Sequence, residues 1–330
     1  MRANRQFLLL PKLRICQLND GQLLVSFIIP TLNEGSNIAS TISSIRASLL
    51  GVHHEIIVVD NGSDDDTVKI SESLADKTFI NPGATIGGLR NIGAAESSGS
   101  ILVFNDADVR LTEAWRGEFD LLKSSLAFEK LIIGGSLDSP ETDNLLFRSW
   151  FKPMLLKKSS AEVSYVGTGH MLVSRDLFFE CGGFDEKLVS GEDSDFCHRA
   201  LRSNANVFFN PNLKAIHLGY PLSLKAFFIR EIWHGKGDFH SLSAFCKSKV
   251  AIFAFAMLLS HITLFVMILL QNTVYMMVMS FVVLAFPLSY SILKYPSRLG
   301  FRNRLGNFFY AYSYLLARSL SWSSRLTAGS

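Results

Sequence analysis

The chain has 330 residues, 48% apolar content and a net charge of +3, so it is long and apolar enough to bury a large core. The positive charge gathers near the C-terminal apolar region and forms no basic stripe interleaved with aromatic residues, which excludes nucleic-acid binding as the function. Its cysteines share no metal-ligand spacing and indicate free thiols in a reduced, cytoplasmic protein. They are Cys16, Cys181, Cys197 and Cys246.

Strands and helices alternate along the first 240 residues. The apolar run Leu24–Ile29 predicts a buried strand, and Asn33–Leu50 has the periodicity of a helix. A second strand is predicted over Glu55–Val59, followed by a helix from Thr67. The strands lack in-out alternation, as expected when helices cover both faces of a parallel sheet. The pattern therefore predicts an α/β fold built from parallel β-α-β units.

Polar clusters follow these two strands and a third apolar run, Ile101–Phe104, which also predicts a buried strand. The clusters are Thr31–Glu34, Asp60–Asp66 and Asp106–Asp108. Any one of them alone is compatible with a solvated turn. In an open parallel sheet, however, ligands bind at the carboxyl ends of the strands. The two carboxylates of Asp106–Asp108 suit a hard divalent cation and, through it, a diphosphate. Phosphate-sugar chemistry is the first hypothesis.

A glycine-rich segment, Gly83–Ala95, lies between the second and third clusters. Its glycines permit close approach of the backbone to a ligand, and Arg90 offers charge-assisted hydrogen bonds to a base or phosphate. The spacing matches neither G-x-G-x-x-G nor the P-loop, so neither a dinucleotide site nor an NTPase is indicated.

A second acidic group begins the predicted helix at Glu192, and it contains Asp193 and Asp195. A carboxylate at a helix N-terminus is favoured by the macrodipole, so simple capping is one interpretation. The other is that Asp193 stays ionised at neutral pH and takes a proton as a general base. Both interpretations stay open on the sequence.

The C-terminal third carries the excess of apolar residues. Val250–Leu293 contains no Asp, Glu, Lys or Arg and divides at Gln271–Asn272 into two runs of about 20 residues, each long enough to span a bilayer. A transmembrane hairpin is predicted, with both ends in the cytoplasm because cationic residues flank it. The alternative is a buried hairpin of a soluble domain, whose helices seldom run so far without a charge. The flanking cations are Lys247, Lys249, Lys294, Arg298, Arg302 and Arg304.

After the hairpin, Phe301–Trp322 mixes aromatic residues and leucines with arginines, Arg318 among them. This composition predicts an interfacial helix on the anionic cytoplasmic leaflet, with a third span as the alternative. Before the hairpin, Arg230–Lys236 is a basic and aromatic cluster that suits donor, acceptor or interface contact. The predicted domains are an N-terminal extension (1–22), a catalytic domain (23–240), two transmembrane helices (248–294) and an interfacial segment (295–330).

Five ordered motifs resemble those of the family 2 glycosyltransferases, over roughly residues 24 to 220. They are Val25–Glu34, Val58–Ser63 with Asp66–Thr67, Gly88–Gly93, Asp106–Asp108 and Gly191–Phe196. The resemblance implies a GT-A fold, a nucleotide-sugar donor, a divalent metal (Mn or Mg) and inverting transfer to an acceptor hydroxyl.

The resemblance also implies roles for individual residues. Around the nucleotide it places Pro30, Thr31, Glu34, Asp60, Arg90 and Asp106. Asp60 accepts a hydrogen bond from the base, and Asp106 reaches the ribose or nucleotide. Asp108 coordinates the metal, and Asp193 is the catalytic base. His217 is either a further metal ligand, as in some proteins of this fold, or a structural residue.

The sequence thus predicts a membrane-anchored enzyme that moves one sugar, by default from a UDP-sugar, to a lipid-linked or amphipathic acceptor. GDP- and dTDP-sugars stay open as donors. The predicted location is the cytoplasmic face of the inner membrane, in a multi-pass protein of cell-envelope, exopolysaccharide or glycolipid synthesis. Processive synthesis is disfavoured because the Gln-x-x-Arg-Trp signature is absent. The alternatives are a metal-dependent sugar nucleotidyltransferase and a non-catalytic nucleotide-binding membrane scaffold.

Overall fold

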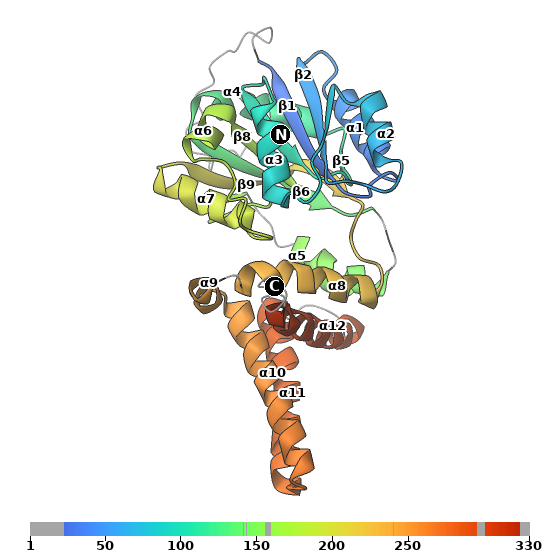
Figure 1. Ribbon diagram of the computed structural model, residues 1–330, viewed down its shortest axis with the longest axis vertical. Coiled ribbons are helices and arrows are strands. Elements are labelled where there is room, and N and C mark those ends of the chain that lie inside the picture. Colours follow the sequence, from blue (N-terminus) through green and yellow to red (C-terminus); the bar gives the residue numbers. More distant parts are fainter. Residues whose placement is uncertain are drawn as a thin grey trace, which may run out of the picture. The chain divides into compact units, whose positions relative to one another are not determined.

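The computed structural model of the chain describes residues 23–140, 142, 144–155, 160–239, 241–295 and 301–323. The described residues of 1–140 and 158–219 form one compact unit, here called the sheet unit, and those of 141–157 and 220–330 form a second, the helical unit (Figure 1). The predicted N-terminal extension, 1–22, lies outside the described residues.

The sheet unit contains a mixed nine-stranded sheet. Its strands are β1 (Val25–Thr31), β2 (His54–Asp60), β3 (Lys77–Ile80), β4 (Ile101–Asn105), β5 (Val109–Leu111), β6 (Leu131–Asp138), β7 (Ala161–Glu162), β8 (His170–Ser174) and β9 (Asn206–His217). The order is β3-β2-β1-β4-β8-β6-β9-β5, with β7 paired to β9. The first four are parallel, as the sequence predicts, whereas β8 runs antiparallel to both β4 and β6.

Helices cover both faces of the sheet (Figure 1). They are α1 (Ile38–Ser48), α2 (Thr67–Leu74), α3 (Ile86–Ala95), α4 (Trp115–Phe128), α6 (Arg175–Glu180) and α7 (Glu192–Arg202). Successive residues of β1 point to opposite faces: Phe27 and Ile29 pack with α1 and α4, whereas Ile28 packs in the cluster that includes α6 and α7. Both faces are dry, which explains the continuous apolar runs that the strands show in sequence.

Two predicted boundaries differ from the structure. The helix expected from Asn33 begins at Ile38, because residues 33–37 form a turn in which Asn33 has a positive φ of 57°. The sequence of Tyr165–Val173 also predicts a strand, but the strand begins at His170, and the Gly169 carbonyl just before it accepts from the Asp106 amide. In both cases the polar turn at the strand end is longer than hydrophobic periodicity alone indicates.

The helical unit has its own aromatic core. Its elements are η3 (Phe147–Phe151), α5 (Lys152–Leu155), α8 (Leu224–Gly235), η4 (Lys236–Phe239), α9 (Leu242–Lys247), α10 (Lys249–Leu269), α11 (Thr273–Lys294), α12 (Phe301–Leu320) and η5 (Ser321–Ser323). Trp150 on η3 is 1% exposed and contacts Phe227, Tyr295 and Tyr314. Residues 220–239, which the sequence assigns to the catalytic domain, therefore pack with the C-terminal helices.

Helices α10 and α11 are long and apolar enough to cross a membrane, with mean hydropathies of 2.4 and 2.0 over their spanning windows. Only 17% of each window is buried, so the pair is not the enclosed core hairpin of a soluble domain. Phe265 and Phe281 are 61% and 76% exposed. Both helices begin with a side-chain cap: the Ala251 amide donates to the Ser248 side chain, and the Tyr275 amide donates to the Asn272 side chain.

Helix α12 packs on α8, α10 and α11. Arg318, counted among the cations of a predicted interfacial helix, is turned into the unit. Its guanidinium lies 3.1 Å from Glu231 Oε2 and 3.1 Å from Asp238 Oδ2. Arg318 therefore forms ion pairs with protein carboxylates. Placement of Phe301–Trp322 at the membrane surface stays a prediction.

Candidate functional site

Asp60 organises the ends of β1 and β2. The Thr31 hydroxyl donates to its Oδ2 at 2.9 Å, and the Ser63 hydroxyl donates to the same oxygen at 2.5 Å. The amides of Gly62 and Ser63 donate to Oδ1 at 2.8 and 2.7 Å. The carboxylate is fully buried and accepts four hydrogen bonds, which hold the loop after β2 against β1. Its contact with a base stays a prediction.

The loops after β1 and β2 are joined by reciprocal hydrogen bonds. The Asn33 amide donates to Ser63 Oγ at 2.8 Å, and the Asp64 amide donates to Asn33 Oδ1 at 2.9 Å. The Glu34 amide donates to the Thr67 hydroxyl at 2.8 Å. Pro30, one residue before the end of β1, is buried in the strand. Two of the three polar clusters recognised in sequence thus form one rigid rim.

The third cluster is the turn between β4 and β5. Asp106 and Asp108 are carried on it, and the Thr41 hydroxyl of α1 donates to the Ala107 carbonyl at 2.7 Å. Val109, at the end of the turn, pairs with His217 at the end of β9. This pairing brings His217 Nε2 to 3.1 Å from Asp108 Oδ2, so the two predicted metal ligands meet.

These residues fit a divalent cation. Two ligand atoms each about 2.1 Å from a metal and at a right angle lie about 3 Å apart, which is the separation of the Asp108 and His217 atoms. Among the described residues, no three His, Cys, Asp or Glu side chains stand together as a complete metal site. Magnesium-type ions commonly take one or two protein ligands and complete their shell with water and substrate phosphates.

Glu34 extends the acidic character of this edge. Burial raises its pKa, and the nearby carboxylates of Asp108 and Asp106 raise it further, while Asn37 donates to its Oε2 at 2.9 Å. The shift shows that the negative charges of all three acids act on the same space. Such a concentration of charge favours binding of a cation.

Arg90 joins the D-x-D turn to the N-terminus of α7. Its Nη2 donates to Asp106 Oδ1 at 2.8 Å, and its Nη1 donates to Glu192 Oε1 at 2.7 Å. The arginine is 3% exposed, and its Nε has no hydrogen-bond partner among the described residues. The sequence placed Arg90 beside a nucleotide but did not anticipate Glu192, because these two residues are 102 positions apart.

Asp193 follows Glu192 in the first turn of α7. The N-cap residue of this helix is Gly191, which has a positive φ of 84° and makes no side-chain cap, and Asp195 pairs with Arg199 at 2.8 Å. Burial, and then the charge of Glu192, raises the pKa of Asp193 to about 6. Asp193 Oδ1 accepts from the Ser194 amide at 2.7 Å, so the carboxylate contacts the N-terminal turn of the helix, and it can also change protonation near neutral pH.

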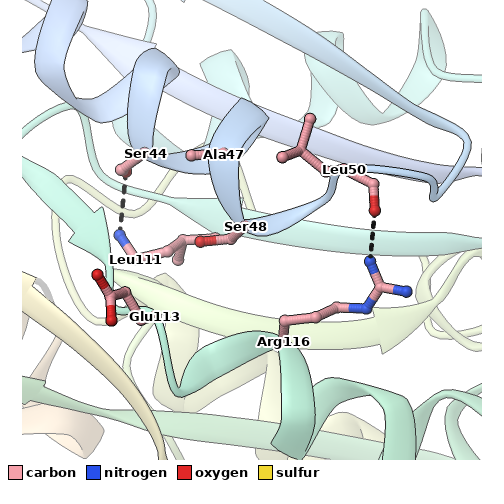
Figure 2. Close-up of a pocket in the computed structure, with 7 residues that line it drawn as sticks. All are labelled: Ser44, Ala47, Ser48, Leu50, Leu111, Glu113 and Arg116. Carbon is pink, nitrogen blue, oxygen red and sulfur yellow. Dashed lines mark hydrogen bonds between the residues drawn. The ribbon is translucent and has the colours of Figure 1, made fainter.

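A separate surface pocket of about 330 Å³ lies between α1 and the start of α4 (Figure 2). Across it, the Leu111 amide donates to Ser44 Oγ at 3.1 Å, and Arg116 donates to the Leu50 carbonyl at 3.0 Å. None of the predicted site residues lines it.

Comparisons with known proteins agree with the motifs. Residues 26–119 match the model of glycosyl transferase family 2. Glycosyltransferase AglE of Haloferax volcanii is 27% identical over 210 residues, 60% of this chain and 67% of that protein. The pre-mycofactocin glycosyltransferase of Mycobacterium tuberculosis is 26% identical over 229 residues, 64% of this chain and 46% of that protein.

The fold agrees as well. The mannosyltransferase PcManGT from Pyrobaculum calidifontis, solved in complex with GDP-Man and Mn²⁺, superposes with a TM-score of 0.59 over 90% of this chain and 86% of that one, at 16% identity. The family match over residues 26–119 and the related glycosyltransferases support a family 2 glycosyltransferase, and the shared structure supports a GT-A fold.

Proposed function

We propose that the chain transfers one sugar, with inversion, from a nucleoside-diphosphate sugar to a hydroxyl of a lipid-linked or amphipathic acceptor. The observation that carries this proposal is the Arg90 bridge, because one buried guanidinium contacts both Asp106 and Glu192. The bridge joins a candidate cation site to the helix turn that carries Asp193. A donor site and a proton acceptor are then adjacent, as group transfer requires.

The nucleoside binds at the rim formed by the loops after β1 and β2. Pro30, Thr31 and Glu34 border it, and Asp60 fixes its shape through four hydrogen bonds. UDP is the default nucleotide, and GDP and dTDP compete with it in the test below. The GDP-Man of the structural relative supports a diphosphate donor without choosing the base.

Asp108 and His217 hold a divalent metal, Mn or Mg, with Asp106 and Glu34 beside it. When bound, the ion offsets the charge that develops on the departing diphosphate. The hydrogen bond from Arg90 fixes the orientation of the Asp106 carboxylate. The mixed oxygen and nitrogen donor set is compatible with Mn and with Mg.

Asp193 is the general base. The acceptor hydroxyl forms a bond to the anomeric carbon while the bond from that carbon to the β-phosphate oxygen breaks, and the hydroxyl proton passes to the Asp193 carboxylate. The nucleoside diphosphate leaves with the bonding electrons. A base with a pKa of about 6 is largely ionised at neutral pH and still has useful proton affinity. A single in-line displacement inverts the configuration.

The helical unit anchors the enzyme in a membrane. Two apolar helices support this proposal, and the cations at both ends of the pair favour a cytoplasmic location of those ends, at the inner membrane. An acceptor with an apolar part concentrates at the same surface, which raises the effective concentration of the two reactants.

The test is product analysis with the full chain in nanodiscs. UDP-, GDP- and dTDP-sugars are supplied with Mn²⁺ or Mg²⁺ and, as acceptor, a polyprenyl-linked sugar with free hydroxyls, with Asp193→Asn as the matched variant. Transferred sugar with free nucleoside diphosphate supports the proposal. In a parallel reaction supplied with nucleoside triphosphates and sugar 1-phosphates, release of pyrophosphate indicates a nucleotidyltransferase. Donor binding without turnover in either reaction indicates a non-catalytic scaffold.

A further inference from the structure

A buried series of hydrogen bonds, separate from those of Arg90, leads to the D-x-D turn. The Trp115 indole N–H donates to His170 Nε2 at 2.7 Å, and His170 Nδ1 bonds to Asn105 Oδ1 at 2.9 Å. Asn105 Nδ2 donates to the carbonyls of Asp106 and Val109, each at 2.9 Å. Trp115, His170 and Asn105 are at most 1% exposed.

The direction of every bond in this series is determined. An indole N–H can only donate, so His170 Nε2 must accept, and a neutral imidazole then carries its proton on Nδ1. Asn105 must accept that proton through Oδ1, which leaves both amide hydrogens for the two carbonyls of the turn. Burial lowers the pKa of His170 to about 3, so the imidazole stays neutral in this arrangement.

The surrounding strands keep the series in place. Asn105 and His170 are paired residues of the antiparallel strands β4 and β8. A Cβ at Gly135 of β6 would lie 2.4 Å from His170 Cδ2, so only glycine leaves room for the imidazole. Trp115 is stacked on Phe119 of its own helix, with ring centroids 4.9 Å apart. Trp115, the first donor of this series of hydrogen bonds, is thus held as rigidly as the rest of the core.

The other end is the turn itself. The Val109 amide donates to the Asp106 carbonyl at 3.1 Å, and the Asp106 amide donates to the Gly169 carbonyl at 3.1 Å. Asn105 therefore binds the two carbonyls that bracket Ala107 and Asp108. Rotation of either peptide plane would change the direction in which the Asp106 and Asp108 side chains leave the backbone.

We propose that Trp115, His170 and Asn105 are positioning residues that hold the turn Asp106–Val109, and thereby its two carboxylates, in the geometry that binds a divalent cation. This inference rests on the proposed function for its cation and deepens it. None of the three residues touches the reacting atoms. They act through the backbone of the turn.

The test uses the full chain with three variants. Asn105→Leu removes the contacts to the turn, Trp115→Phe removes only the first donor, and Leu126→Ala is the control, since Leu126 is fully buried on α4 and belongs to the same core. Hydrogen exchange of the backbone amides of residues 106–109 is measured without metal. The Mn²⁺ concentration that gives half-maximal UDP binding, here called the Mn²⁺ midpoint, is measured separately.

In Asn105→Leu we expect faster exchange of the turn amides and a Mn²⁺ midpoint raised by about 10–100-fold, the usual effect of losing support for metal ligands. Trp115→Phe should change the exchange rates and the Mn²⁺ midpoint in the same direction, by smaller amounts. If Asn105→Leu does not fold, the result for Trp115→Phe tests the proposal. The control lowers thermal stability but leaves both readouts within about twofold. Shifts no larger than the control's would overturn the proposal. Absence of Mn²⁺-dependent binding in the unmodified protein would instead refute the metal-dependent function, and the exchange rates alone would then decide whether the three residues hold the turn.

Discussion

Replacing Asp193 with asparagine separates a catalytic base from a helix cap, because the two roles predict opposite changes in stability. The pKa of Asp193 is raised from 3.8 to about 6, so the folded protein holds this proton more tightly than the unfolded chain. Its contribution to the free energy of unfolding is greatest below about pH 4 and is lost as the pH rises through about 6. At pH 7.5 the ionised carboxylate is therefore destabilising.

The size of the effect follows from the shift. About 2 pKa units at 1.36 kcal/mol each give an upper bound near 3 kcal/mol, and screening at a partly exposed group reduces this to about 1–2 kcal/mol. Asp193→Asn should gain that amount at pH 7.5 and gain little at pH 4. A helix cap would instead lose about 1 kcal/mol on substitution.

The assay combines unfolding with turnover. Thermal unfolding of the full chain is followed at pH 4 and 7.5, with Asp195→Asn as control because Asp195 lies in the same helix turn and makes a surface pair with Arg199. Donor binding should be kept while turnover falls by about 10²–10⁴-fold. In the unmodified enzyme, turnover should fall about tenfold per pH unit below pH 6. A destabilised Asp193→Asn protein with near-normal turnover would refute the assignment and pass the base role to Glu192 or Asp195.

Three further outcomes are expected. Asp108→Asn should weaken Mn²⁺-dependent binding of nucleoside diphosphate by at least about tenfold in thermal-shift titrations, and unchanged binding in the folded variant would remove the D-x-D turn from the mechanism. Arg318→Met should lower the stability of the helical unit by about 3–5 kcal/mol because Glu231 loses its partner. Adding Glu231→Leu to Arg318→Met should restore most of the lost stability. Equal stability of the single and double variants would contradict this reasoning. The full chain should fractionate with membranes and resist high-salt extraction. In intact cells, an impermeant maleimide should react with Gln271→Cys, which lies on the side of the membrane away from the cytoplasm, whereas the exposed Cys246 should react only after lysis. Labelling of both cysteines from one side would reject the hairpin topology.

The sequence by itself determined the parts of this protein that depend on local pattern. Apolar runs without alternation predicted β1, β2 and β4, and the polar residues after each run predicted an edge where ligands bind. The uncharged stretch between Lys249 and Lys294 likewise predicted two membrane-length helices, since length and hydropathy are properties of the segment alone. The periodicity of a helix or a strand depends only on the residues of that segment and not on residues far away in the sequence.

Only the tertiary structure decided which distant side chains meet. Arg90 and Glu192 are 102 positions apart, and Trp115 and His170 are 55 apart, so no local pattern relates them. Their meeting depends on the antiparallel insertion of β8 beside β4, which sets the register that pairs Asn105 with His170. The described residues of 141–157, together with 220–239, join the C-terminal helices for the same reason. Burial of aromatic surface stabilises contacts whatever the sequence separation of the residues.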